Sequence, residues 1–147
     1  MKDIWEKYEK IEIIGAGSFA DVYRAKNIET KEYVAIKEIK TNHFEDEKYC
    51  YFIMEYIENG NLYDLIKKSP NKILPINEVS HIIKQLVCAI YYLHNMNPPI
   101  IHRDIKPENI LLDNNNIIKL TDFGWSNYIN LTEIRNTFCG TPLYYSP

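Results

Sequence analysis

"HRDIKPEN", residues 102–109, is the stretch of sequence that decides the fold of this chain. It places an imidazole, two cations, a carboxylate (Asp104) and an amide (Asn109) within eight residues, and Pro107 restricts the backbone between them. Such a combination rarely arises by chance in a merely polar loop. The stretch therefore predicts a catalytic loop.

"DFG", residues 122–124, follows this loop across a predicted hairpin. The apolar runs "ILL" and "IIKLT" flank a polar "DNNN", which is typical of two antiparallel strands with a polar tip. Because Asn109 and Asp122 lie at the two ends of this hairpin, strand pairing would return them to the same edge. An amide oxygen and a carboxylate placed together there can hold Mg²⁺, which prefers hard oxygen ligands.

Before the loop, the first part of the chain alternates short apolar runs with turn residues. "IEII", "DVYRAK" and "YVAIKEI" predict three antiparallel strands over residues 11–39, and "CYFIMEYI" predicts another over residues 50–57. After the first strand, Gly15 and Gly17 would let the backbone fold over an anion and present N–H groups to phosphate oxygens. A Rossmann site is disfavoured because a strand follows the glycines. An ordinary tight turn remains the alternative.

Lys37 lies in the third of these strands and strengthens the phosphate interpretation. Side chains alternate along a strand, so Ala35 and Lys37 share one face. A small residue beside a cation suits a surface covered by a flat base and its phosphates. The alternative is a lysine that is simply solvated.

The second part of the chain predicts helices. "NLYDLIKKS" is a short helical candidate that Pro70 ends, and Asn77 is a plausible N-cap for a helix that continues to residue 96 and ends before "NPP". The tail, residues 125–147, has no clear period and predicts a loop. The long helix must bury an apolar face formed by Val79, Ile82, Ile83, Leu86, Val87, Ile90 and Leu93.

With these motifs, nearly the whole chain resembles the catalytic domain of eukaryotic protein kinases. The resemblance implies a two-lobed α+β fold, with a β-rich lobe and hinge strand at about 1–57 and an α-rich lobe at about 58–147, both incomplete. It implies transfer of the γ-phosphoryl group of ATP, with Mg²⁺, to protein hydroxyls. "DIKPEN" is similar to the Ser/Thr-specific loop. "DFGWS" and "FCGT" resemble Aurora-type kinases, whereas "GSFADVYRA" leans toward the Polo-like group, so the subfamily stays open.

The resemblance also implies roles for individual residues. Asp104 matches the aspartate that accepts the proton of the substrate hydroxyl, Lys106 and Lys37 match the catalytic lysines, and Asn109 and Asp122 match the metal ligands. Met54 falls at the gatekeeper position, and Ala20 replaces the third glycine of the loop. The implied ATP-binding positions are Ile14, Gly15, Ala16, Gly17, Ser18, Phe19, Ala20, Val22, Ala35, Lys37, Glu55, Ile57, Glu108 and Leu111.

Thr137, in "RNTFCGTPLYYSP", matches a position where many such kinases are phosphorylated. A phosphate there would add about −1.5 to −2 charges and could pair with Arg103. The alternative is that Thr137 is an ordinary loop hydroxyl.

The stretch between Lys37 and Glu55 is too short to contain the elements that kinases have at this place. Only seventeen residues separate the two, fewer than an average helix of about 11 residues plus two strands of about 5. "FEDEKYCYFIMEY", residues 44–56, matches the end of the family's fourth strand and its fifth strand. The regulatory helix, with the glutamate that pairs with Lys37, is expected to be absent, a gap of roughly thirty residues. Glu45 and Glu47 fall in an inter-strand loop of the family pattern and do not take that role.

The sequence also ends at "YYSP", one residue before the glutamate of the family's A-P-E motif. The later helices of the large lobe would then be absent, and the apolar face of the long helix would lose covering. We therefore expect the isolated chain to fold poorly or to aggregate.

Composition limits the remaining function classes. The chain has 147 residues, one domain by length, and a net charge of −3, which favours neither nucleic acid nor an anionic membrane as main partner. Cys50, Cys88 and Cys139 have no metal-type spacing, and an odd, sparse set fits reduced thiols in the cytoplasm or nucleus. Neither a signal peptide nor a membrane span is predicted.

Three interpretations of the chain follow. The first is a Ser/Thr protein kinase that acts on an unidentified protein substrate, with any activating partner unknown. The second is a truncated, catalytically weak or inactive kinase-like module that binds nucleotide or a partner. The third is a fragment of a longer enzyme, which the position of the gaps inside required elements favours over the second.

Overall fold

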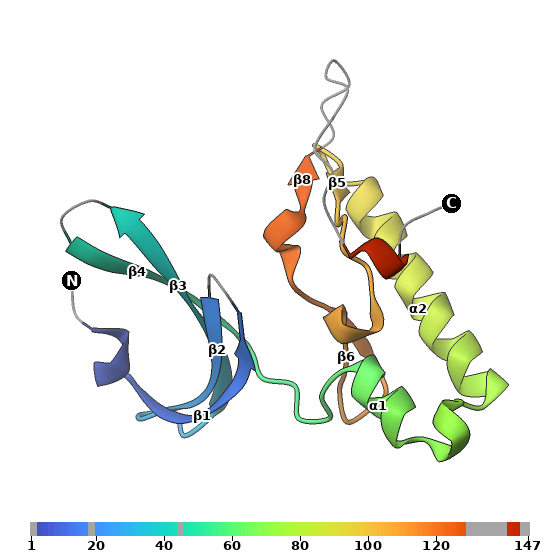
Figure 1. Cartoon of the computed structure of the whole chain (residues 1–147), viewed down its shortest axis with the longest axis horizontal. Coiled ribbons are helices and arrows are strands. Elements are labelled where there is room, and N and C mark those ends of the chain that lie inside the picture. Colours follow the sequence, from blue (N-terminus) through green and yellow to red (C-terminus); the bar gives the residue numbers. More distant parts are fainter. Residues whose placement is uncertain (1–2, 18–19, 44–45, 129–140, 145–147) are drawn as a thin grey trace. The chain divides into compact units, whose positions relative to one another are not determined.

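The computed structural model describes residues 3–17, 20–43, 46–128 and 141–144. The chain divides into two compact units, Met1–Tyr56 and Ile57–Pro147. The first is built from strands, and the second combines helices with short strand pairs (Figure 1). This is an incomplete two-lobed α+β arrangement, as the sequence predicts. Among the described residues, no helix combines the length and apolar character that crossing a membrane requires.

The first unit is an antiparallel sheet in the order β1-β2-β3-β4. A 3₁₀ turn, η1 (Ile4–Glu6), precedes the sheet. The core of the first unit centres on Ile36, which is fully buried and clusters with Tyr8 and Ala25. The strands are β1 (Tyr8–Ala16), β2 (Ala20–Asn27), β3 (Tyr33–His43) and β4 (Asp46–Glu55).

The expected division of residues 44–56 between two strands is wrong. From Asp46 to Glu55 the backbone is one strand, paired with β3 in an unbroken register in which Lys37 faces Phe52 and Asn42 faces Glu47. Glu47 therefore lies in a strand rather than in a loop, and Glu45 lies outside the described residues. The reason is chain length: with so few residues after Lys37, the nearest pairing partner for the aromatic run of β4 is β3 itself. Residues 37–43 and 46–55 contain no helix.

The second unit begins with α1 (Leu62–Lys68), as predicted. The side chain of Asn61 accepts a hydrogen bond from the backbone N–H of Asp64 at 2.8 Å, which satisfies one of the free donors of the first turn. A single turn of 3₁₀ helix, η2 (Pro70–Lys72), follows.

The long helix α2 (Ile76–His94) also forms, but Asn77 does not cap it. Pro75 occupies the N-cap, and Asn77 lies inside the first turn. A proline, whose φ is fixed and which has no N–H to satisfy, suits the residue next to a helix start. At the other end the amide of Asn95 donates to the carbonyl of Tyr91 at 2.7 Å and closes the last turn before "NPP".

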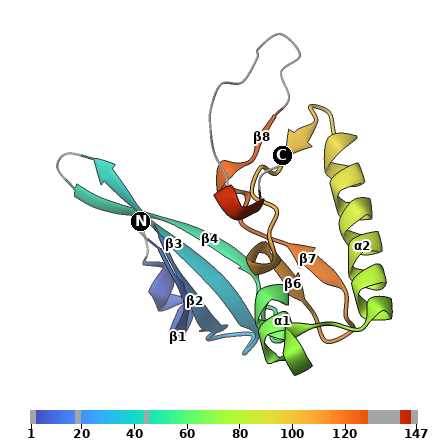
Figure 2. The same cartoon turned by 45° about the vertical axis from the view of Figure 1, so that its right-hand side comes forward.

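Two short antiparallel pairs complete the second unit (Figure 2). The predicted hairpin is confirmed: β6 (Ile110–Leu112) pairs with β7 (Ile118–Leu120). The loop predicted over residues 125–147 is wrong in part, because β8 (Asn127–Tyr128) pairs with β5 (Ile100–Ile101) and Pro142–Tyr144 form the 3₁₀ turn η5. Two further 3₁₀ turns are η3 (Pro107–Asn109) and η4 (Phe123–Trp125). The core of this unit is Leu62, Ile82, Ile110, Leu112 and Ile118.

The apolar face of α2 is only partly covered. Ile82 is buried and packs in the core with the half-buried Leu86, whereas Ile83 is 50% exposed and Val87 is 59% exposed. Tyr91 continues this stripe one turn later at 70% exposure. An apolar stripe of this helix is therefore exposed to solvent.

Replacing Ile83 and Val87 together with glutamine is expected to increase the monomeric fraction of the protein. Each apolar Å² that self-association removes from water is worth about 25 cal/mol, so polar side chains on the stripe weaken association. Sedimentation velocity over a range of concentrations measures the effect. Lys84→Gln, an exposed polar position of the same helix, is the control. A cooperative, high-temperature melt of fully monomeric parent protein would contradict the expectation.

Candidate active site

His102 anchors the loop between β5 and η3. Its ring is almost fully buried, and the backbone N–H of Asp104 donates to its Nδ1 at 3.3 Å. Because Nδ1 accepts, the proton of the neutral ring is on Nε2, which donates to the carbonyl of Thr121 at 2.9 Å. The ring also packs edge-on against Phe123, with 4.7 Å between centroids. The histidine thus connects the loop at residues 102–109 to the "DFG" stretch.

Asp104 lies at the centre of a dense set of donors. Its Oδ1 accepts from the hydroxyl of Thr141 at 2.7 Å, and its Oδ2 accepts from the ammonium of Lys106 at 2.9 Å and the amide of Asn109 at 3.0 Å. Lys106 also donates to the oxygen of Thr141 at 2.8 Å. The carboxylate side chain is only 5% exposed. The three residues therefore fix both oxygens in a nearly dry setting.

This environment lowers the pKa of Asp104 below its ordinary value. Burial, the largest influence, pushes the pKa upward, but the hydrogen bonds from Thr141, Lys106 and Asn109 and the charge of Lys106 together outweigh it. Asp104 is therefore ionised at neutral pH and can accept a proton.

Thr141→Val is expected to raise the pKa of Asp104 toward its ordinary value, because the carboxylate loses one donor. A folded-state pKa below the unfolded one stabilises the fold above the ordinary value near 4, and this stabilisation is lost as the pH falls through the folded pKa. Carboxyl-carbon NMR during an acid titration measures the shift. Thr30→Val, which removes an exposed Thr–Glu hydrogen bond, is the matched control. An unchanged Asp104 titration in Thr141→Val would overturn this account.

Asn109 and Asp122 lie close along the hairpin, as strand pairing predicts. The N–H of Thr121 donates to the carbonyl of Asn109 at 2.9 Å. Thr121 therefore lies opposite Asn109, and Asp122 is the next residue along the chain. Asp122 has a left-handed backbone, φ 59°, and a Cβ at Gly124 would lie 3.2 Å from its Oδ1. Glycine at 124 therefore leaves room for this carboxylate.

The donor set fits a divalent cation that brings ligands of its own. Asn109 uses its NH₂ group twice, toward the carbonyl of Asp104 at 2.8 Å and toward Oδ2 of the same residue. Its amide oxygen is thereby left as a hard oxygen ligand, the kind that Mg²⁺ prefers. Within the described residues, no group of three or more His, Cys, Asp or Glu side chains could hold a metal. The remaining ligands would have to come from phosphate oxygens and water.

The predicted phosphate-binding turn is described in part. The N–H of Gly17 donates to the carbonyl of Ala20 at 3.0 Å, and a Cβ at Gly17 would lie 3.2 Å from that oxygen, so the close approach favours glycine. A Cβ at Gly15 would make only ordinary contact with Val22. Ser18 and Phe19 lie outside the described residues. The tight turn and the phosphate loop both remain compatible with this geometry.

Strand register places the predicted base-binding residues on one face of the first unit. Val22 pairs with Lys37, and Ala35 pairs with Met54. Ala35 is buried, and Lys37 is half-buried. Of the other predicted positions in this unit, Ile14 and Ala16 lie exposed in β1, Ala20 begins β2, and Glu55 ends β4.

Three predicted nucleotide positions belong to the second unit. Ile57 is its first residue. Leu111 is half-buried between the buried Ile110 and Leu112, so it faces away from the core on the opposite side of β6. The Oε2 of Glu108 is buried without a hydrogen-bond partner in the described part of the chain. Thr137 lies outside the described residues.

Thr141 is the site residue that sequence reasoning missed. It is 37 residues from Asp104, and no local spacing links the two. Its only signal was its place in the "FCGTP" motif near Thr137. Its hydroxyl bridges the carboxylate and the ammonium of the pair Asp104–Lys106.

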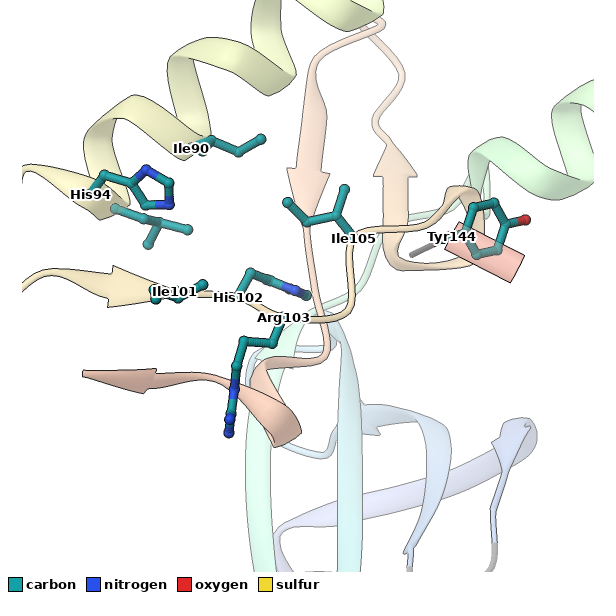
Figure 3. Close-up of a pocket in the computed structure, with 8 residues that line it drawn as sticks. Ile90, His94, Ile101, His102, Arg103, Ile105 and Tyr144 are labelled. Carbon is teal, nitrogen blue, oxygen red and sulfur yellow. The ribbon is translucent and has the colours of Figure 1, made fainter. Parts of the chain in front are cut away.

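A cavity of about 300 Å³ lies beside the same loop (Figure 3). His102, Arg103 and Ile105 line it from the loop, and Ile90 and His94 line it from α2. Figure 3 shows Arg103 extending away from the two α2 side chains. Arg103 has a left-handed backbone, φ 68°, and Asp104 is not among the lining residues.

Comparison with known proteins identifies the family of this chain. Residues 40–147 match the family described as protein kinase domain. An Aurora kinase of Saccharomyces cerevisiae is 51% identical over 108 residues, which cover 71% of this chain and 28% of the relative. The probable serine/threonine-protein kinase MARK-C of Dictyostelium discoideum is 36% identical over 174 residues, covering 95% of this chain and 22% of the relative. The human NUAK family SNF1-like kinase 1 is 36% identical over 172 residues, covering 96% and 25%.

The lengths of these alignments differ from the length of the chain. An alignment of 174 positions exceeds the 147 residues of the chain, so the Dictyostelium relative has residues in the aligned region that have no counterpart here. The chain spans about a quarter of the length of the curated relatives it matches. Because the family model matches more than half of the chain, and relatives at 36% identity align with nearly all of it, the chain belongs to the protein kinase domain family.

Proposed function

We propose that this chain carries the catalytic machinery of a Ser/Thr protein kinase, which transfers the γ-phosphoryl group of ATP to a serine or threonine hydroxyl of a protein. The observation that carries the proposal is the buried, ionised Asp104 held by Thr141, Lys106 and Asn109. Electrostatic positioning supplies most of the catalysis in phosphoryl transfer, and such a fixed carboxylate suits it.

Asp104 is the proton acceptor in this proposal, and Oδ1 is the better placed of its two oxygens. Oδ2 already accepts from Lys106 and Asn109, whereas within the part of the chain that the structure describes Oδ1 accepts from Thr141 alone. A carboxylate oxygen has two lone pairs, so Oδ1 retains one for a substrate hydroxyl. Thr141 fixes the direction of that lone pair, and the charge of Lys106 stabilises the ionised carboxylate until the proton arrives.

Asn109 and Asp122 are the residues that would hold Mg²⁺. When bound, this ion neutralises phosphate charge and orients the phosphates. The amide of Asn109 is fixed by Asp104, so its oxygen keeps a constant direction relative to the proton acceptor. Lys37 would contact the α- and β-phosphates, and Val22 and Ala35 would contact the base. The remaining ATP-binding positions named from the sequence belong to the same proposal.

Phosphate incorporation from γ-labelled ATP into a mixed peptide library tests this function. We expect Mg²⁺-dependent labelling of serine and threonine, identified by phosphoamino-acid analysis, with tyrosine unlabelled. Labelling that is insensitive to chelation of Mg²⁺, or that falls on tyrosine, would contradict the proposal.

A nucleotide- or partner-binding module is the second candidate, and the direct β3–β4 hairpin favours it. Where the family has a helix that supports the strand lysine, residues 37–43 and 46–55 are strand. The expected result for this candidate is thermal stabilisation by ATP without turnover. Phosphorylation at Thr137 and a working place inside the cell, in line with the free Cys50 and Cys88, are further parts of the proposal.

A further inference from the structure

The first unit carries a lysine ammonium between two aromatic rings, away from the proposed nucleotide residues. The Nζ of Lys10 lies 4.0 Å from the ring centroid of Trp5 and 3.9 Å from that of Tyr23. The two rings are 5.5 Å apart and inclined by 79°, so the cation lies in the corner between two π faces. Tyr51 packs edge-on against Trp5, with 6.0 Å between the ring centroids, and adds a third aromatic ring to this cluster.

Glu38 provides the negative charge of this corner. Its Oε2 is 3.6 Å from the ammonium of Lys10, and its Oε1 accepts from the indole N–H of Trp5 at 3.3 Å. The carboxylate side chain is only 14% exposed. Burial first, and then the charge of Glu38 and its hydrogen bonds, raise the pKa of both Tyr23 and Tyr51, which agrees with a carboxylate held against the two phenols.

We propose that Trp5, Tyr23, Tyr51 and Glu38 form a binding site for a methylated lysine side chain of another protein, occupied in this structure by the chain's own Lys10. We call these four residues the ammonium cage.

Cation recognition explains this arrangement better than simple packing does. The side chain of Lys10 is 40% exposed, so its ammonium has access to water, and yet it lies about 4 Å from two rings. Withdrawal of Lys10 would leave two aromatic faces and a mostly buried carboxylate without a cation, which is costly. A cation arriving from outside restores both interactions.

The occupant itself indicates the class of ligand. Lys10 reaches the corner with a four-carbon stem, so a lysine side chain has the length and shape that the site accepts. Methylation keeps the charge but spreads it over carbon atoms, which lowers the desolvation cost and adds contact with the rings. A methylated lysine can therefore compete with a tethered, unmethylated one.

NMR titration of the indole N–H of Trp5 tests the cage. The probe is Nα-acetyl-trimethyllysine amide, and the uncharged comparison carries tert-butyl in place of trimethylammonium. In Lys10→Ala we expect a saturable shift with the charged probe, at least five-fold tighter than in the parent and absent with the uncharged analogue. Lys7→Ala is the matched control, because Lys7 lies 6.0 Å from the ring of Tyr8 and outside the cage. It should behave like the parent.

Further variants keep the outcome decisive. Lys10→Met retains most of the side-chain stem. It should therefore still bind the probe if the truncation in Lys10→Ala disturbs the strand. Glu38→Gln in the Lys10→Ala background should weaken binding at least five-fold. Equal binding of the uncharged analogue, or no saturable shift in either Lys10 variant, would overturn the proposal.

Discussion

Asp104→Asn is expected to lower the rate of phosphoryl transfer by about 10²–10⁴-fold, the range typical of a lost general base. Asparagine keeps the shape of the side chain but cannot take up a proton, and its NH₂ group would face donors that now point at a carboxylate. The KM for ATP should change little, because Asp104 is proposed to contact the substrate hydroxyl and not the nucleotide. Initial rates at saturating ATP and peptide, with KM measured in parallel, give both quantities.

Glu78→Gln controls for the loss of one negative charge, since Glu78 is exposed in the first turn of α2 and far along the chain from the catalytic loop. Its rate should equal that of the parent. If Asp104→Asn retains the parent's rate while remaining folded, Asp104 is not the proton acceptor. If the parent and every variant are inactive but ATP stabilises them, the binding-module interpretation gains.

The parts of the fold that the sequence predicts best are those encoded by neighbouring residues. The "DNNN" tip and its flanking apolar runs specify the β6–β7 hairpin locally, and the hairpin then brings Asn109 and Asp122 near one edge. The apolar period of α2 similarly predicts a helix whose Ile82 is buried. In both cases the interactions that decide the structure lie within a few residues of one another.

Features that depend on tertiary contacts were not predictable in the same way. Thr141 reaches Asp104 across 37 residues, and Trp5 reaches Glu38 across 33. The periodicity of a sequence predicts contacts within one element, and it does not predict contacts between residues so far apart along the chain. Pro75 replaces Asn77 as the cap because the helix begins two residues earlier than side-chain chemistry favours. The length of β4 depends on its pairing with β3. The family pattern has additional residues between these strands, so it did not predict this pairing.

Inserting a kinase-family segment of about thirty residues, with its regulatory helix, between β3 and β4 is expected to raise the phosphoryl-transfer rate by about 10²-fold, the cost that small misplacements of a catalytic group can reach. In the resembled family, this segment carries a helix whose glutamate pairs with the strand lysine, and both must be in place for transfer. Here Lys37 lies in a strand that turns back directly into β4, with Phe52 as its cross-strand neighbour. A supporting helix would fix the ammonium and also cover Phe52, which is 51% exposed.

The gain must come from the helix and its glutamate, and two controls separate these from chain length. A Gly/Ser insert of equal length should leave the rate at the parent's level, because it relaxes the hairpin without supplying the helix and its glutamate. The helical insert with its glutamate changed to glutamine should cover Phe52 but restore little of the rate. If the Gly/Ser insert raises the rate as much as the helix does, strain in the hairpin limits the parent. If neither insert helps, the limitation lies in the second unit, where the apolar stripe of α2 remains exposed.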